Sequence, residues 1–118
     1  MNDFDSIQRE ILIEGLEDYV GLWQVARSVR RTFGELPTER IRELALHRLK
    51  PLLDGALIEA GVPAEGGSFA CWGSDAATTL HRIDAEWREL GKDPNIPDIC
   101  WFSNTEKGDL FVKTFYGP

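Results

Sequence analysis

The chain has 118 residues, with 13 basic and 20 acidic side chains and a formal net charge of −7 at pH 7. This length suits one domain, so we expect residues 1–118 to fold as a single unit. The content of 42% hydrophobic and 28% charged residues is that of a globular protein and excludes a disordered chain. No apolar run approaches the roughly 20 residues that span a bilayer, and the acidic N-terminus does not resemble a secretory signal. We therefore expect a soluble cytoplasmic protein without a membrane segment.

Helical periodicity begins near the N-terminus. Asp5 and Gln8 have the spacing of a capping box, and apolar residues then recur at helical intervals, so a first helix is expected over residues 6–16. A second apolar stripe at the same spacing predicts a helix over residues 22–33. Gly34 follows this stripe and supplies a stop, because glycine adopts the positive φ that often ends a helix.

A third helix is predicted after the Leu36-Pro37-Thr38 sequence, because proline suits the first helical turn and threonine can cap it. Pro51 lacks a backbone donor and is expected to kink or end this helix near Lys50. Residues 56–60 are interpreted as a short strand or as the tail of the helix. Residues 62–75 carry a proline and three glycines and are expected to form a loop.

The fourth helix is predicted over residues 76–90, where apolar residues recur at steps of four and three. Ser74 or Asp75 would cap its start, and Gly91 would close its end. The periodic positions of the four helices predict a core that contains Ile11, Leu12, Leu16, Leu22, Val25, Val29, Leu44, Leu49, Leu53, Leu80, Ile83 and Trp87.

Two segments near the C-terminus are rich in β-branched and aromatic residues, at residues 98–103 and 110–115. The polar segment between them contains Gly108 at a plausible turn position. These features predict a C-terminal β-hairpin with a charged tip.

This order of three helices, a short strand and a hairpin resembles the winged helix-turn-helix superfamily. The resemblance lies in the element order, in residues 20–26, and in residues 49–60, which look like the end of a third helix turning into the first strand. It implies an α+β, winged-helix-like fold with three N-terminal helices, an inserted fourth helix and the C-terminal β-hairpin as the wing. It also implies DNA binding through the second and third helices.

Catalytic and cofactor motifs are absent from the sequence, which contains no nucleophile elbow, phosphate-binding loop, dinucleotide fingerprint or zinc-protease motif. Cys71, Cys100, His47 and His81 include no pair at a short metal-ligand spacing. We therefore expect a protein that is not an enzyme and that has no cofactor and no metal site.

Charge is unevenly distributed along the chain. Residues 1–26 carry one basic and six acidic side chains, residues 27–50 carry seven and three, and residues 51–118 carry five and eleven. A basic segment therefore lies inside an acidic protein. It supports the alternative function, a winged-helix DNA-binding regulator, whose contact residues would be Arg27, Arg30, Arg31, Arg40, His47 and Lys50. A solvated helix face paired with the acidic first helix is the other interpretation.

The leading hypothesis is a non-enzymatic protein-binding module, specifically an acidic cytoplasmic inhibitor or immunity-type partner of a basic toxin or nuclease. Small acidic inhibitors use carboxylates for fast encounter with a basic partner and aromatic side chains for affinity. The fourth helix and the turn after it are acid-rich, and Trp23 lies off the apolar stripe of its helix. The predicted partner-binding residues are Asp84, Glu86, Glu89, Asp93 and Trp23. A solubilising acidic surface without a partner explains the same charge.

Overall fold

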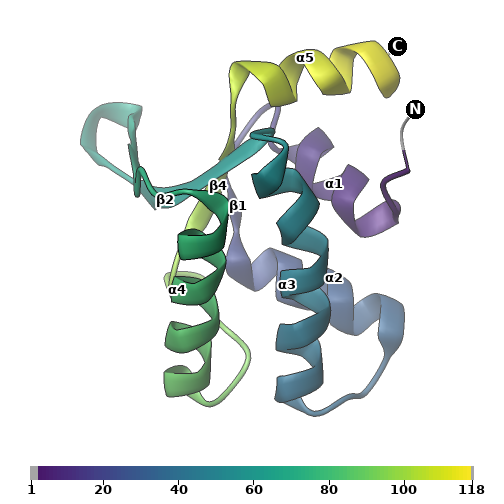
Figure 1. The fold of residues 1–118 in the computed structure, drawn as a ribbon, viewed down its shortest axis with the longest axis vertical. Coiled ribbons are helices and arrows are strands. Elements are labelled where there is room, and N and C mark those ends of the chain that lie inside the picture. Colours follow the sequence, from purple (N-terminus) through teal and green to yellow (C-terminus); the bar gives the residue numbers. More distant parts are fainter. Residues whose placement is uncertain (1–2, 118) are drawn as a thin grey trace.

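The computed structural model describes residues 3–117, which form an α+β fold (Figure 1). The helices are α1 (Ser6–Glu14), α2 (Leu22–Phe33), α3 (Thr38–Asp54), α4 (Ala76–Leu90) and α5 (Glu106–Phe115). The strands are β1 (Val20–Gly21), β2 (Ile58–Pro63), β3 (Phe69–Cys71) and β4 (Trp101–Asn104). The α+β class expected from the sequence is therefore confirmed. None of the described helices is long and apolar enough to cross a membrane.

The strands form one antiparallel sheet in the order β1-β4-β2-β3. Trp101 on β4 lies opposite Gly21 on β1 and Gly61 on β2, and Gly61 in turn lies opposite Cys71 on β3. In Figure 1, α3 and α4 stand side by side, α5 lies across one end of the molecule, and the β2–β3 hairpin projects from the side.

The hydrophobic core joins the helices to one face of the sheet. Predicted core residues from α1 to α4 are buried, including Leu12, Leu22, Leu49 and Trp87, and Phe102 adds the sheet's contribution. Leu44 and Leu80 are half-buried and pack against this core.

The prediction that Leu16 belongs to the core is wrong, because this residue is 38% exposed. The first helix ends at Glu14, two residues earlier than the stripe suggested, and residues 15–18 turn toward β1. The periodic position of Leu16 therefore lies on a turn and not on a helix face.

Several predicted helix ends are confirmed. Asp5 and Gln8 form both hydrogen bonds of the capping box, and the Asp75 side chain accepts from the Thr78 backbone N–H at the start of α4. Gly34 and Gly91 end α2 and α4 with φ of 89° and 73°.

Of the two outcomes expected at Pro51, a kink or the end of the third helix near Lys50, the second is wrong, since α3 continues through Pro51 to Asp54. Proline removes one backbone donor, but Leu52 and Leu53 just beyond it are buried in the core. Burial of these side chains keeps the last turn helical, because tertiary packing supplies most of the stability of a helix in a protein.

The predicted C-terminal hairpin is also wrong, because residues 106–115 form α5. The Thr105 side chain caps this helix by accepting from the Gly108 N–H at 3.0 Å, and it donates to the Ala56 carbonyl at 2.7 Å. Gly108 is buried against the chain before β2, where an added Cβ would lie 2.0 Å from the Leu57 carbonyl oxygen. The glycine therefore allows close helix packing and does not form a turn.

A hairpin is present instead at residues 58–71, which overlap the predicted loop at residues 62–75. Residues 58–71 form β2 and β3, joined by a tight turn in which Gly66 and Gly67 have positive φ. The strand expected over residues 56–60 starts at Ile58 and runs on to Pro63.

Candidate functional site

The face of the sheet that points away from the core carries aromatic side chains. Along β4, Phe102 is buried whereas Trp101 and Ser103 on either side are half-buried, and along β2 the half-buried Glu59 lies between buried Ile58 and Ala60. Successive side chains of a strand point to opposite faces, so this alternation separates a core face from an outer face. Trp101, Ser103 and Glu59 belong to the outer face.

Two indole rings lie close to Gly21 on the outer face. A Cβ added at Gly21 would lie 2.4 Å from Cδ1 of Trp23 and 3.2 Å from Cζ3 of Trp101. The absence of a side chain at Gly21 therefore makes room for both rings. The Trp23 indole nitrogen is buried without a hydrogen-bond acceptor among the described residues, which costs free energy.

A second aromatic pair lies on the same face. Phe69 shares its face with Cys71 by strand alternation, and the ring of Tyr19 packs against the Phe69 ring with centroids 4.8 Å apart. The Tyr19 hydroxyl donates to the carbonyl of Gly67 at 3.0 Å, which ties the segment before β1 to the hairpin turn. We call Tyr19, Trp23, Phe69 and Trp101 the aromatic face.

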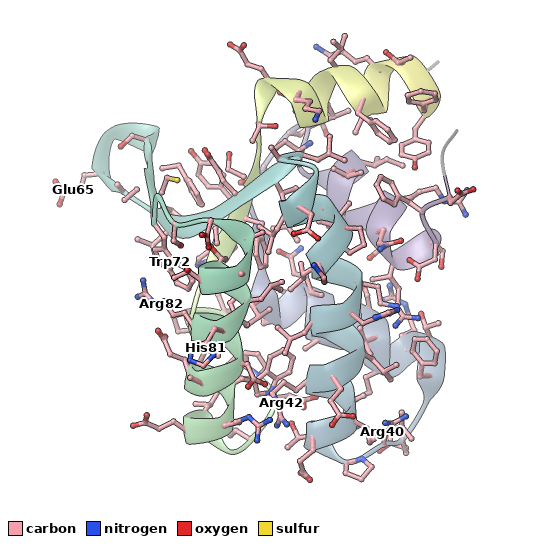
Figure 2. All side chains as sticks on the ribbon, viewed as in Figure 1. Arg40, Arg42, Glu65, Trp72, His81 and Arg82 are labelled. Carbon is pink, nitrogen blue, oxygen red and sulfur yellow. The ribbon has the colours of Figure 1, made fainter. Side chains whose placement is uncertain are left out.

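Carboxylates accompany the aromatic face. Glu59 lies opposite Ser103 on the outer side of the sheet, Asp18 directly precedes Tyr19, and Glu65 lies on the hairpin turn, where Figure 2 shows it at the outer end of the projecting hairpin. Within residues 3–117, none of these three carboxylates forms an ion pair with a basic side chain. Their negative charge is therefore not compensated locally.

The acidic residues predicted on α4 are largely used inside the protein. Asp84 accepts from Arg42 of α3 and from Arg88 of its own helix, both at 2.9 Å. The Arg42 side chain is only 6% exposed and lies between the two helices (Figure 2). This ion pair joins α3 to α4 and neutralises the charge of Asp84.

Two more of the predicted carboxylates are paired. Glu86 accepts from Arg82 at 2.7 Å, and Asp93 accepts from Arg30 at 2.8 Å. The hydrogen bond to Asp93 raises the pKa of Arg30 above its ordinary value. Glu89 is exposed and makes no ion pair with any described residue. The predicted set thus does not come together as one uncompensated acidic surface.

The basic residues of the DNA-binding alternative are also mostly paired with carboxylates. Besides Arg30, these pairs are Arg31 with Glu10, Arg40 with Glu43, and Lys50 with Asp54. Among the described residues, Arg27 and His47 are the members of the predicted set without an ion pair, and Arg27 lies over the Trp23 ring at 4.8 Å. Most of the positive charge of residues 27–50 is therefore neutralised by carboxylates, so this segment does not form a strongly basic surface.

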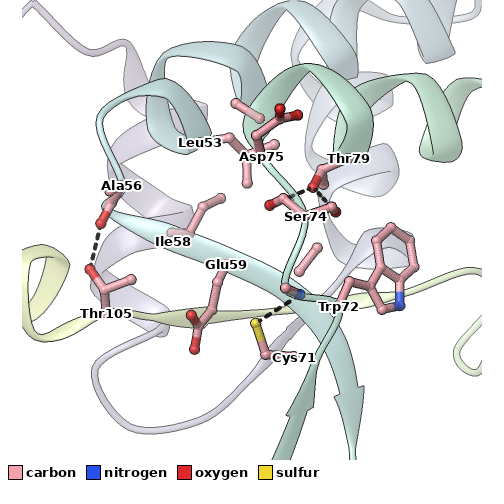
Figure 3. A pocket seen from close by; sticks show the side chains of 13 residues that line it. Leu53, Ala56, Ile58, Glu59, Cys71, Trp72, Ser74, Asp75, Thr79 and Thr105 are labelled. Carbon is pink, nitrogen blue, oxygen red and sulfur yellow. Dashed lines mark hydrogen bonds between the residues drawn. The ribbon is translucent and has the colours of Figure 1, made fainter.

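A pocket of about 250 Å³ opens where β3 separates from β2 (Figure 3). In this view Glu59 and Cys71 point to one side of β2, and Asp75 and Thr79 lie beyond its other side. The Cys71 sulfur accepts from the Gly73 N–H at 3.3 Å, and the lining residues include no histidine. The backbone N–H of Thr78 lowers the pKa of Asp75, which serves as the α4 cap. These groups do not form a nucleophile and base in contact.

The two thiols differ in reactivity. Cys71 is exposed, whereas Cys100 is buried on the core side of β4, and burial raises the pKa of the Cys100 thiol far above its ordinary value. Since the thiolate is the reactive form, Cys71 is the accessible nucleophile of the pair. Within residues 3–117, no three histidine, cysteine or acidic side chains are arranged to hold a metal ion.

Comparisons of the chain with protein-family models, curated proteins and solved structures found no match. The sequence reasoning identified Trp23 by its position off the helical stripe, but it missed Tyr19, Phe69 and Trp101 as a group. They lie on three segments that only the sheet register brings together, although the alternation of Trp101 with Phe102 is visible in the sequence.

Proposed function

We propose that the chain is a non-enzymatic, cytoplasmic protein-binding module that takes a basic protein as its partner, in the manner of an acidic inhibitor or immunity-type protein. The observation that carries this proposal is the aromatic face, an outward-pointing set of rings beside uncompensated carboxylates. The partner is a protein with a positively charged surface, such as a toxin or nuclease.

Aromatic side chains on an outer sheet face suit an interface. Tyr19, Trp23, Phe69 and Trp101 are all half-buried, so each ring keeps surface that a partner can cover. Tryptophan and tyrosine are enriched among the residues that dominate binding energy, because a large rigid ring loses little conformational entropy on binding. The Tyr19 and Phe69 rings already pack against each other, which reduces that cost further.

Charge selects the partner. The whole chain carries −7, and Asp18, Glu59 and Glu65 near the aromatic face lack an ion-pair partner among the described residues. Such carboxylates attract a basic protein during diffusion and raise the association rate. The carboxylates of α4 contribute less, because Asp84 and Glu86 are neutralised by arginines of the same chain.

Cys71 provides a direct test, because its thiol belongs to the outer face and is the reactive one of the two. The chain is labelled at Cys71 with a thiol-reactive benzophenone, added to an extract of the native host and irradiated. The control is the variant Cys71→Ser with Thr114→Cys, which places the label on the exposed side of α5. We expect one basic protein to be cross-linked from Cys71 and not from position 114. Cross-linking of an acidic protein or of nucleic acid, equal labelling from both positions, or no product from Cys71 contradicts the proposal.

Association kinetics with the purified partner then locate the steering charges. The double variant Asp18→Lys with Glu59→Lys should lower the association rate at least tenfold at low salt, and the effect should shrink as salt screens the charges. The charge-matched control is Glu39→Lys with Glu89→Lys, on α3 and α4, for which we expect less than a threefold change. A larger effect in the control would place the steering surface on the helices instead.

A further inference from the structure

We infer that the groove between α2 and residues 93–97 binds a small organic carboxylate with an aromatic or branched aliphatic body. This site shares Trp23 with the aromatic face, but its ligand is not the proposed protein partner and its test uses no partner protein. Its walls are Trp23, Ala26 and Arg27 of α2 on one side and the loop with Pro94, Ile96 and Pro97 on the other. We call it the Trp23 groove.

The size and lining of the Trp23 groove suit a small ligand. This open groove has a volume of about 560 Å³, within the range of roughly 300 to 1,000 Å³ that small-molecule sites occupy. Its apolar surface comes from an indole, an alanine, two prolines and Ile96, which is 58% exposed. Covering this exposed isoleucine with an apolar part of a ligand contributes favourably to the free energy of binding.

The loop wall is held in place before any ligand arrives. Asp93 is bound on one oxygen by Arg30 at 2.8 Å and on the other by the Thr38 hydroxyl, which ties the loop to α2 and α3. Asn95 and Asp98 close a turn on the far side, with the Asn95 N–H donating to the Asp98 carboxylate at 2.7 Å. A preformed site avoids the entropy cost of ordering a loop on binding.

Charge identifies the polar end of the ligand. Within the groove, Asp93 and Arg30 neutralise each other, and Arg30 also donates to the Leu36 carbonyl at 3.1 Å. Arg27 has no ion-pair partner among residues 3–117, and its guanidinium lies over the Trp23 ring. The groove therefore has one uncompensated positive charge in an otherwise acidic protein. A guanidinium binds a carboxylate with two parallel hydrogen bonds, while the ligand body packs on Ile96 and the indole.

The inference is tested with three probes that share one body and differ in their polar end: 3-phenylpropionate, 3-phenylpropanol and 3-phenylpropylammonium. Titrations into the ¹⁵N-labelled chain are followed by NMR. We expect the carboxylate to bind at least tenfold more tightly than the alcohol and the ammonium to bind weakest. The shifted amides should be those of residues 23–30, Asp93, Asn95 and Ile96.

Two variants separate the contributions. Arg27→Gln should weaken the carboxylate about tenfold, as expected for one charge-assisted hydrogen-bonded contact, and should remove its advantage over the alcohol. Ile96→Ser should weaken all three probes alike. The charge-matched control Arg9→Gln, on α1, should change nothing, since Arg9 is an exposed arginine that does not line the groove.

Several results would overturn the inference: equal binding of carboxylate and alcohol, preference for the ammonium, shifts confined to other residues, or unchanged affinity in Arg27→Gln. The titration uses the isolated chain, and Glu59→Lys should leave it unaffected. Failure of the Trp23 groove and failure of the protein interface are therefore observed independently.

Discussion

The two faces of the sheet use the same strands for different purposes. On the core face, Phe102 is 1% exposed and packs with residues of the helices, whereas Trp101, its neighbour in sequence, lies half-buried on the outer face beside Gly21. The core face is covered by helices of the same chain, and ion pairs join these helices to one another. The outer face presents large rings and uncompensated carboxylates. Aromatic content alone therefore does not distinguish a core from an interface, because the strand register decides which ring is covered.

The largest expected effect comes from truncating the core face. Phe102→Ala should lower the free energy of unfolding by about 3 to 5 kcal/mol, because it leaves a cavity among buried side chains. Trp101→Ala removes a larger ring but from a half-buried position, so we expect a loss of less than half that size. Urea denaturation of both variants measures the difference. Equal losses would mean that the outer face contributes to stability as much as the core face does.

An intermediate effect is expected where the core-side helices are joined by charge. Arg42→Met removes the nearly buried partner of Asp84 and should cost about 2 to 3 kcal/mol, less than the loss of a fully buried pair because Asp84 keeps Arg88. Arg88→Met is the control. It removes an exposed pair within one helix, for which we expect about 0.5 kcal/mol or less. Thermal and urea unfolding at low and high salt compare the two, and a larger loss for Arg88→Met would contradict this assignment.

The smallest effect concerns two tryptophans whose indole nitrogens are both buried without an acceptor, Trp23 on the outer face and Trp87 in the core. Trp23→Phe removes that unpaired donor from a half-buried ring, so the gain from losing the donor offsets the lost contacts and the unfolding free energy should change by about 0.5 kcal/mol or less. Trp87→Phe also leaves a cavity and should cost about 1 to 2 kcal/mol. Paired denaturation curves test this ranking, and the reverse order would show that Trp23 serves the core.

Much of the helical layer could be predicted from the sequence. The Asp5–Gln8 capping box, the Asp75 cap, and the glycines after α2 and α4 are local signals, and the structure confirms each. The segment at residues 110–115 shows where local signals mislead, because β-branched and aromatic residues favour a strand by propensity. Docking of Gly108 against Leu57 and the Thr105 cap make the same residues helical. Tertiary packing overrides this preference, because the whole β-propensity scale spans only about 1 kcal/mol between residue types.

By itself, the sequence determined the α+β class, the first four helices and most of the buried residues on these helices. Helical periodicity and caps involve residues within one or two turns of each other, so they can be recognised locally. Only the tertiary structure decided which charges remain free and which rings share a face. Arg30 and Asp93 are 63 positions apart in the chain and still pair, and Tyr19 reaches Phe69 across the sheet. Such contacts depend on strand register and helix packing, so charge runs and aromatic counts along the chain could not reveal them.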